Sequence, residues 1–251
     1  MGRITEIASH NNMIVTYIFH SCFTVELENC TFVFDYFKDA SNKLDEIMKR
    51  SKMIYILSSH SHQDHFNPHV FEWAVQYPNI KYILSSDIRK KVKKLALPQN
   101  VHFIKEGECI AVEKGVEIRA FGSTDIGVSF MVTADDKHIF HAGDLNNWHW
   151  IDESTPSEVI VAEKAFKEKL KTIKNYSTEI YLAFFPVDPR LGQDYAAGAR
   201  QFVHDFKVKY FIPMHFWNDP DKANDFVLYQ NNTFGQYISI NKEGDSITIN
   251  K

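Results

Sequence analysis

The chain has 251 residues, of which 44% are hydrophobic and 24% charged, and its formal net charge is −4 at pH 7. These proportions are typical of a globular chain with a full core, and they exclude a disordered or fibrous protein. The acidic balance gives no electrostatic reason to bind a long polyanion, so we expect no nucleic-acid partner.

The N-terminal residues lack the apolar core of a secretory signal, and no later stretch approaches the roughly 20 apolar residues that span a bilayer. We therefore expect a cytoplasmic protein with no membrane partner. The chain has no linker-like or repeated segment, which predicts a single domain over residues 1–251. The sequence leaves the oligomeric state open.

Short runs rich in β-branched and aromatic residues predict strands along the whole chain. Polar turns such as Glu28-Asn29 and Ala134–Lys137 separate consecutive runs in the first half and predict antiparallel pairing there. The predicted strands are Met13–Phe19, Phe23–Leu27, Thr31–Tyr36, Met53–Leu57, Lys81–Leu84, Val101–Ile104, Cys109–Val112, Val116–Phe121, Gly127–Thr133, His138–His141, Ile180–Phe184, Tyr210–Pro213, Gln236–Ile240 and Ser246–Ile249.

Helices are predicted between several of these strands. The clearest begins at Thr155, where Thr-Pro-Ser-Glu forms a capping box with Pro156 at the first helical position, followed by apolar residues at spacings of three and four. Strands that outnumber helices predict an α/β (α+β) protein with two sheets and helices packed outside them. Further helices are predicted at Asn42–Arg50, Pro68–Tyr77, Asp87–Leu95, Tyr195–Phe206 and Lys222–Gln230.

The segment Ser58–Pro68, SSHSHQDHFNP, places three histidines and an aspartate within six positions, directly after an apolar run. On extended backbone, His60 and His62 lie on the same side and can reach one ion. Asp64 and His65 follow as the chain bends, and they can serve a second ion roughly 3.5 to 4 Å from the first. A lone histidine is usually an ordinary core or surface residue, but chance rarely produces a cluster this dense.

A site for two ions needs further donors, which must come from other strand ends on the same rim. Asp144 follows a predicted strand in a glycine turn, and its carboxylate can bridge two ions; His215 ends another strand. Taken alone, each could equally be a turn or core residue. The predicted metal ligands are His60, His62, Asp64, His65, Asp144 and His215.

Together these motifs resemble those of the metallo-beta-lactamase superfamily. His60–His65 matches its signature motif, Ala142–Asp144 its bridging-aspartate motif and Pro213–His215 its final histidine motif. The resemblance reaches from about Tyr17 to His215. It implies a four-layer αββα sandwich of two mixed, largely antiparallel sheets, with a dinuclear centre on the edge that the sheets share.

The N-terminal stretch TYIFHSCFTVELENCTFVFDYF is similar to one branch of this superfamily, which includes ascorbate-6-phosphate lactonases and phospholipase D-like hydrolases. The resemblance implies that His20 and Ser21 lie near the active site and that Asp35 supports the signature loop. A carboxylate in that place would fix the orientation of a ligating imidazole. Alternatively, His20 is a strand-turn histidine and Asp35 a turn aspartate.

One position departs from the superfamily pattern, which usually supplies a third histidine to the first ion. The corresponding stretch, IRAFGSTDIGVSF, has none. Asp125 could replace it, Ser123 or Thr124 could hold a ligated water, or the second site alone could be filled; Asp125 could equally be a turn residue. An oxygen-richer first site would favour manganese or iron over zinc. The expected cofactor is one or two divalent ions of zinc, manganese or iron.

The predicted chemistry is hydrolysis, because a divalent ion lowers the pKa of bound water from about 15.7 toward about 7. We expect a metal-bound hydroxide to attack an ester, lactone or phosphodiester of a small metabolite. Asp64 would ligate the second ion and orient this nucleophile, while His20 could donate a hydrogen bond to the substrate or to the developing oxyanion. Two alternatives remain, namely an iron-dependent oxidoreductase with the same ligand set and a non-catalytic metal-binding member.

Substrate recognition is expected from the loops around the rim. Trp148 lies in the loop after Asp144, and Arg190 lies in a loop after another strand, where it could hold a phosphate or carboxylate of the substrate. Arg190 could instead simply pair with Asp188 or Asp194. An anionic small molecule is therefore only mildly favoured.

Overall fold

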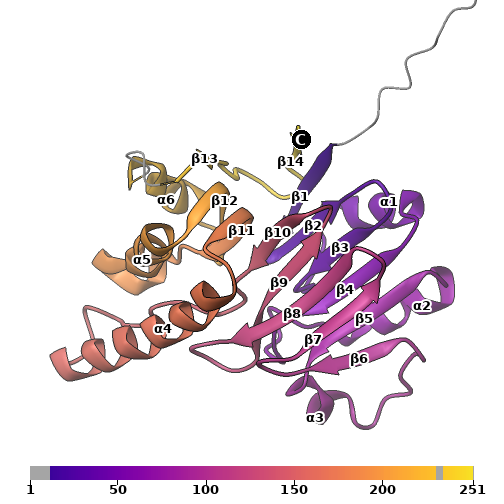
Figure 1. The fold of residues 1–251 in the computed structure, drawn as a ribbon, viewed down its shortest axis with the longest axis horizontal. Helices are drawn as coiled ribbons and strands as arrows, with labels where there is room; N and C mark the ends of the chain where they lie inside the picture. Colours follow the sequence, from indigo (N-terminus) through magenta and orange to yellow (C-terminus); the bar gives the residue numbers. More distant parts are fainter. Residues whose placement is uncertain (1–11, 230–233, 251) are drawn as a thin grey trace, which may run out of the picture.

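The computed structural model describes residues 12–229 and 234–250, which form two seven-stranded sheets packed face to face (Figure 1). The first sheet has the order β14 (Ser246–Ile249), β1 (Met13–Phe19), β2 (Cys22–Glu26), β3 (Thr31–Phe34), β4 (Ile54–Ser58), β5 (Ile80–Ser85) and β6 (Val101–Ile104). The second has the order β13 (Gln236–Tyr237), β12 (Lys207–Met214), β11 (Glu179–Pro186), β10 (Lys137–His141), β9 (Val128–Ala134), β8 (Val116–Gly122) and β7 (Cys109–Glu113).

Both sheets are mixed. Strands β1 to β3 and β7 to β10 pair antiparallel, as the short turns predicted. Strands β3 to β6 pair parallel, so the prediction of an antiparallel first half is wrong for this part. Parallel neighbours need crossover connections, and the helices between these strands provide them. Because β10 to β13 are also parallel, parallel pairs are as frequent as antiparallel ones, and the sheets are not largely antiparallel.

Helices cover the outer face of each sheet (Figure 1). On the first sheet, Leu44 and Met48 pack against Val33, Ile54 and Ile56 of the strands. The helical segments between its strands are α1 (Lys43–Arg50), η1 (Pro68–Phe71), α2 (Trp73–Gln76) and α3 (Ile88–Val92). Those that follow β10 are α4 (Pro156–Tyr176), η2 (Pro189–Asp194), α5 (Ala197–Asp205), α6 (Pro220–Asn224) and η3 (Asp225–Tyr229).

The core lies between the sheets and beneath the second helix layer. Phe32, Phe34 and Tyr55 of the first sheet share one apolar cluster with Phe130 and Phe184 of the second. Side chains that alternate along each strand thus face the core on one side and the helices on the other. This arrangement is the predicted αββα sandwich, and it brings the ends of strands from both sheets to one edge.

Most local predictions hold, with differences at the shorter helices. The capping box is confirmed, since Thr155 Oγ1 accepts from Glu158 N at 3.4 Å and the Glu158 carboxylate accepts from Thr155 N at 2.8 Å. The helix predicted over Pro68–Tyr77 divides into η1 and α2, and the one predicted from Lys222 divides into α6 and η3, with Gln230 outside the described residues. The strand predicted over Gln236–Ile240 is limited to two residues.

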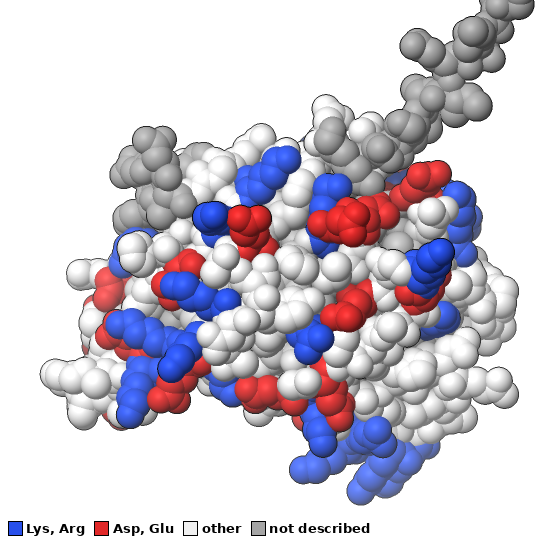
Figure 2. Space-filling view, viewed as in Figure 1, with Lys and Arg blue, Asp and Glu red and all other residues white. Residues whose placement is uncertain are grey.

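Charged side chains of both signs are interspersed over the face shown in Figure 2, and basic side chains gather at its lower edge, over α3. In α3, Ile88 and Val92 are buried while Arg89, Lys90 and Lys91 are exposed, as in an ordinary amphipathic helix. Within residues 12–229 and 234–250, no helix combines the length and the apolar character needed to cross a membrane.

Candidate metal centre

The predicted ligands converge on the edge where strands of both sheets end. The signature loop follows β4, Asp144 follows β10 and His215 follows β12, while His20 lies in the turn between β1 and β2. Three residues of this rim hold left-handed backbone, with φ of 57° at His20, 46° at Asp35 and 64° at His215. Each costs about 1–2 kcal/mol for a residue other than glycine, and such strain is concentrated at functional sites.

A first group of donors comprises His60, His62, Asp125 and Asp144, whose ligand atoms all lie within 4.8 Å of one another. His60 Nε2 is 3.1 Å from His62 Nδ1 and 3.2 Å from Asp144 Oδ2. Asp125 Oδ2 is 3.6 Å from His62 Nδ1, so the structure brings Asp125 to the place where the sequence lacks a third histidine. The group therefore offers two imidazoles and two carboxylates.

A second group comprises His20, Asp64, His65 and His215, again with ligand atoms within 4.8 Å of one another. Asp64 Oδ2 is 3.4 Å from His20 Nε2 and 3.8 Å from His65 Nε2. Asp144 reaches this group too, because its Oδ1 is 3.1 Å from His65 Nε2 and 3.2 Å from His215 Nε2. Asp144 thus lies between the two groups, with one oxygen toward each.

The donor atoms at the centre fit a divalent metal ion. The Nε2 atoms of His20, His65 and His215 and Oδ1 of Asp144 are buried, and they form no hydrogen bond with any residue that the structure describes. Leaving one such atom without a partner costs about 1–3 kcal/mol. Several unpaired imidazole and carboxylate atoms directed at one point match the ligand chemistry of zinc, manganese or iron.

Two buried carboxylates contact the Nδ1 atoms of His65 and His215, on the side of each ring that faces away from the centre. Asp35 is fully buried and accepts hydrogen bonds from Ser59 N and Ser59 Oγ, both at 2.7 Å, and contacts His65 Nδ1 at 2.8 Å. Asp188 contacts His215 Nδ1 at 2.9 Å in the same way. Because Nδ1 of each ring has an outer partner, Nε2 is left to face the centre. Sequence reasoning missed this role of Asp188, although it follows a strand end just as Asp35 does.

Electrostatics keep the central carboxylates charged. Burial alone would raise the pKa of Asp144, but the charges of His65 and His215 outweigh it and leave this pKa well below the ordinary value. The pKa of Asp64 is also lowered, because its contact with His20 at 3.4 Å and the charge of His65 outweigh its burial. Burial, followed by the charge of His215, lowers the pKa of His20 to about 3, so this imidazole is neutral at pH 7. A neutral imidazole is the form that binds metal.

The two predicted substrate-binding residues lie beside this centre. Trp148 Nε1 donates to the carbonyl oxygen of Asp144 at 2.7 Å, and its ring is 5.4 Å from that of His215. Arg190 pairs with Asp188 through two nitrogens, the closer at 2.6 Å, which is one of the alternatives that the sequence left open. Its side chain is 48% exposed, so it can still face a ligand. The substrate-binding role of both residues stays a prediction.

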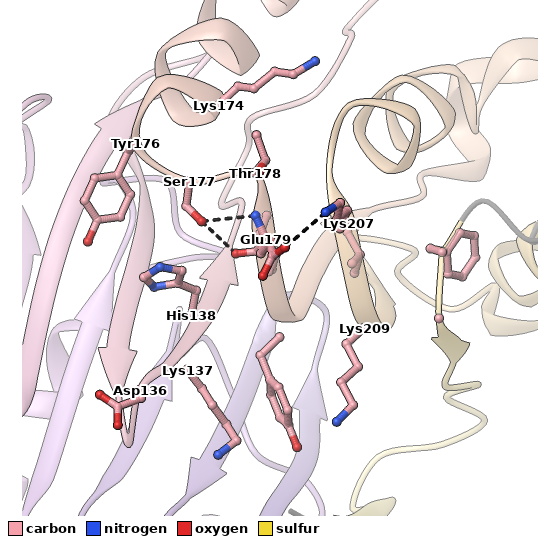
Figure 3. Close-up of a pocket in the computed structure, with 15 residues that line it drawn as sticks. Asp136, Lys137, His138, Lys174, Tyr176, Ser177, Thr178, Glu179, Lys207 and Lys209 are labelled. Carbon is pink, nitrogen blue, oxygen red and sulfur yellow. Dashed lines mark hydrogen bonds and ion pairs between the residues drawn. The ribbon is translucent and has the colours of Figure 1, made fainter.

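A wide surface hollow of about 980 Å³ lies elsewhere, where β11 and β12 begin (Figure 3). Lysines surround it, but two of them are already paired, Lys207 with Glu179 at 3.2 Å and Lys174 with Asp205 at 2.9 Å. Among the metal-ligand candidates, His215 follows the opposite end of β12. The hollow shares no lining residue with the two donor groups, and the chemistry favours the rim.

Close backbone approach at Gly127 positions the signature loop. This residue has φ of 79°, and a Cβ added to it would overlap the carbonyl oxygen of Ser59 and the Cβ of His60. We expect Gly127→Ala to displace His60 and lower the metal content of the protein. Gly115→Ala is the matched control, because Gly115 has φ of 82° but no described atom within 4 Å of an added Cβ. It should cost only the shared backbone strain of about 1–2 kcal/mol; equal metal contents in the two variants would contradict this role of Gly127.

Comparison with known proteins identifies the family of this chain and shows its fold. The profile of the beta-lactamase superfamily domain matches residues 14–161, more than half of the chain, and the chain belongs to this family. No curated protein matches the sequence.

Several solved structures share the fold. Igni18, described as a novel metallo hydrolase from the hyperthermophilic archaeon Ignicoccus hospitalis, has a TM-score of 0.69 at 16% identity, over 96% of this chain and 99% of Igni18. The metallo-beta-lactamase fold protein YhfI from Bacillus subtilis has a TM-score of 0.65 at 12% identity, over 95% and 99%. CmlA from Streptomyces venezuelae, described as a diiron beta-hydroxylase, has a TM-score of 0.63 at 12% identity, over 94% of this chain and 54% of CmlA. At these identities the likeness shows the fold alone.

Proposed function

We propose that this protein is a metal-dependent hydrolase of an ester, lactone or phosphodiester in a small, anionic metabolite. The observation that carries the proposal is the position of Asp144, with one oxygen toward each of two donor groups at the rim of the sandwich. A shared carboxylate between two neighbouring sets of ligands is the arrangement that two-metal hydrolysis needs.

Each ion would have its own set of ligands besides Asp144. His60, His62 and Asp125 would hold one ion, and Asp64, His65 and His215 the other. A bound divalent ion lowers the pKa of water, so that a nucleophile is available at neutral pH, and polarises the bond to be broken. Asp35 and Asp188 keep the imidazoles oriented for this task.

Asp64 is suited to orient the attacking water. Its side chain is 25% exposed, and its lowered pKa keeps it charged, so it can accept a hydrogen bond from water at the rim. The same low pKa makes it a weak proton acceptor. We therefore assign Asp64 the role of holding the water in position rather than that of a strong general base.

Trp148 and Arg190 would recognise the substrate. The half-exposed guanidinium of Arg190 lies 5.6 Å from the centre of the Trp217 ring, and its partner Asp188 contacts His215, so Arg190 lies on the His215 side of the centre. A phosphate or carboxylate of the substrate would be attracted there. This preference agrees with the similarity of the N-terminal stretch to the branch of ascorbate-6-phosphate lactonases and phospholipase D-like hydrolases.

An iron-dependent oxidoreductase is the second candidate. The first group offers two carboxylates beside two imidazoles, a set that suits harder ions such as iron or manganese. CmlA, which shares the fold, is itself described as a diiron beta-hydroxylase. A non-catalytic metal-binding protein is the third possibility.

The test is hydrolysis by protein stripped with a chelator and reloaded with zinc, manganese or iron. The substrates are esters, lactones and phosphodiesters in matched neutral and anionic pairs. We expect reloaded protein to favour the anionic members, and Asp64→Asn, which would misplace the attacking water, to lower turnover by about 10²-fold. Asp136→Asn, in the β9–β10 turn, is the matched control and should keep full activity.

Two results would contradict the proposal. Turnover that requires iron together with oxygen and an electron donor would favour the oxidoreductase. Metal-replete protein that hydrolyses no member of the panel would favour the non-catalytic alternative.

A further inference from the structure

His20 occupies a position that its predicted role as a hydrogen-bond donor to the substrate does not explain. Its backbone is held on both sides, because His20 N donates to the Tyr17 hydroxyl at 2.9 Å and its carbonyl oxygen accepts from His215 N at 3.3 Å. These bonds maintain the left-handed turn and place the ring beside the final histidine. The His20 side chain is fully buried, which leaves a substrate little access to it.

The ring of His20 is enclosed by other members of the centre. Its centroid lies 4.2 Å from that of His215, 4.3 Å from that of Trp217 and 5.5 Å from that of His65. Both ring nitrogens are buried and form no hydrogen bond with the described residues. Nε2 faces Asp64 Oδ2 at 3.4 Å without the geometry of a hydrogen bond. A buried imidazole whose two nitrogens form no hydrogen bond lacks a binding partner. Nε2 points toward Asp64, so the missing partner would lie between these two side chains.

We propose that His20 Nε2 ligates the ion of the second group, and that this ion, rather than the one at His60 and His62, is the tightly held member of the pair. The inference rests on the metal centre of the proposed function and deepens it. The first group has two imidazoles, where the superfamily pattern has three. The second group then has three, because His20 joins it from a different part of the chain.

The difference in burial gives the order of affinity. In the second group, His20 and His65 are fully buried, His215 is 4% exposed and Asp64 25%, while in the first group His60 is fully buried but His62 is 50% and Asp125 41% exposed. Buried ligands that neighbouring residues already orient lose less conformational entropy when an ion binds than exposed side chains do. Three imidazoles and one carboxylate also suit zinc better than two imidazoles and two carboxylates.

The first experiment measures the metal retained after dialysis against a weak chelator. His20→Asn keeps the turn, because asparagine adopts left-handed backbone readily, but its side chain is too short to reach the ion. His62→Asn removes a histidine from the first group and is the matched control. Wild type and His62→Asn should each retain about one zinc ion per chain, and His20→Asn should bind zinc at least about tenfold more weakly. Equal retention by His20→Asn and wild type would overturn the proposal.

A second measurement needs no variant and covers the case in which His20→Asn does not fold. Wild-type protein labelled with ¹⁵N-histidine is titrated with zinc, and the Nε2 resonances are followed. The first equivalent should shift three of them, those of His20, His65 and His215; a shift of only two, or of His60 and His62 first, would overturn the proposal. Neither experiment uses turnover, so a protein that hydrolyses nothing would contradict the proposed function without affecting this result.

Discussion

Asp144→Ala is expected to empty both metal sites. Asp144 is the only carboxylate among the described residues that the structure places against both donor groups, with Oδ2 3.2 Å from His60 Nε2 and Oδ1 3.1 Å from His65 Nε2. Losing an outer partner of a ligand already costs about 10–100-fold in metal affinity, and a shared ligand should cost more at each site. Hydrolysis should fall below detection together with the metal content. Elemental analysis of the purified variant measures this directly.

Asp125→Ala is the comparison that separates a shared carboxylate from one that serves a single group. Asp125 contacts only the first group, so this variant should lose the more weakly held ion and keep the other. Full retention of metal by Asp144→Ala would refute the assignment of the centre. Loss of both ions from Asp125→Ala as well would show that the two groups do not fill independently.

Asp35→Asn is expected to weaken both folding and metal binding. Asp35 is fully buried, and its carboxylate meets Ser59 N, Ser59 Oγ and His65 Nδ1 at 2.7 to 2.8 Å. An amide fits the space and tolerates the left-handed backbone, but it turns a donor toward groups that need an acceptor. Breaking a buried charged network by removing one partner costs about 3–5 kcal/mol. Metal affinity should fall by about 10–100-fold, since His65 loses the group that orients it.

Denaturant unfolding without metal and calorimetric titration with zinc measure the two effects. Burial would raise the pKa of Asp35, but His141 and His65 outweigh burial and lower it. The carboxylate therefore stabilises the folded state fully above its ordinary pKa of about 3.9, and this contribution is lost as the pH falls through the lowered folded value. The difference in the free energy of unfolding between wild type and Asp35→Asn should therefore be largest above about pH 3.9 and should shrink as the pH falls further.

Asp39→Asn is the control, because Asp39 also accepts a backbone hydrogen bond, from Leu44 N at 2.9 Å, but lies outside both donor groups. It should cost about 1 kcal/mol of stability and leave zinc affinity unchanged. Similar losses of zinc affinity in Asp35→Asn and Asp39→Asn would mean that Asp35 acts only on folding.

The secondary structure could be predicted because it depends on local pattern. Short runs rich in β-branched and aromatic residues predicted the strands, and the Thr155 capping box predicted the start of α4. Strand direction was harder, since β3 to β6 are joined by crossovers whose helices are short and irregular. The pairing of such strands depends on contacts between distant segments, which periodicity does not report.

Part of the centre could be predicted for the same reason. His60, His62, Asp64 and His65 are close in sequence, so their spacing alone indicated shared ions, and Asp144 and His215 each follow a strand. The sequence did not indicate Asp188 as a partner of His215, because a pair with the neighbouring Arg190 already accounted for its charge. The structure shows that Asp188 contacts both residues.

The sequence by itself determined the kind of protein: a sandwich of two sheets with histidines and aspartates at its strand ends. Only the tertiary structure decided which distant side chains complete the two donor groups, with Asp125 beside His62 and His20 beside Asp64. The physical reason is that coordination depends on the directions of side chains from strands far apart in the chain. The left-handed turns at His20 and His215, together with the close approach of Gly127 to His60, set those directions.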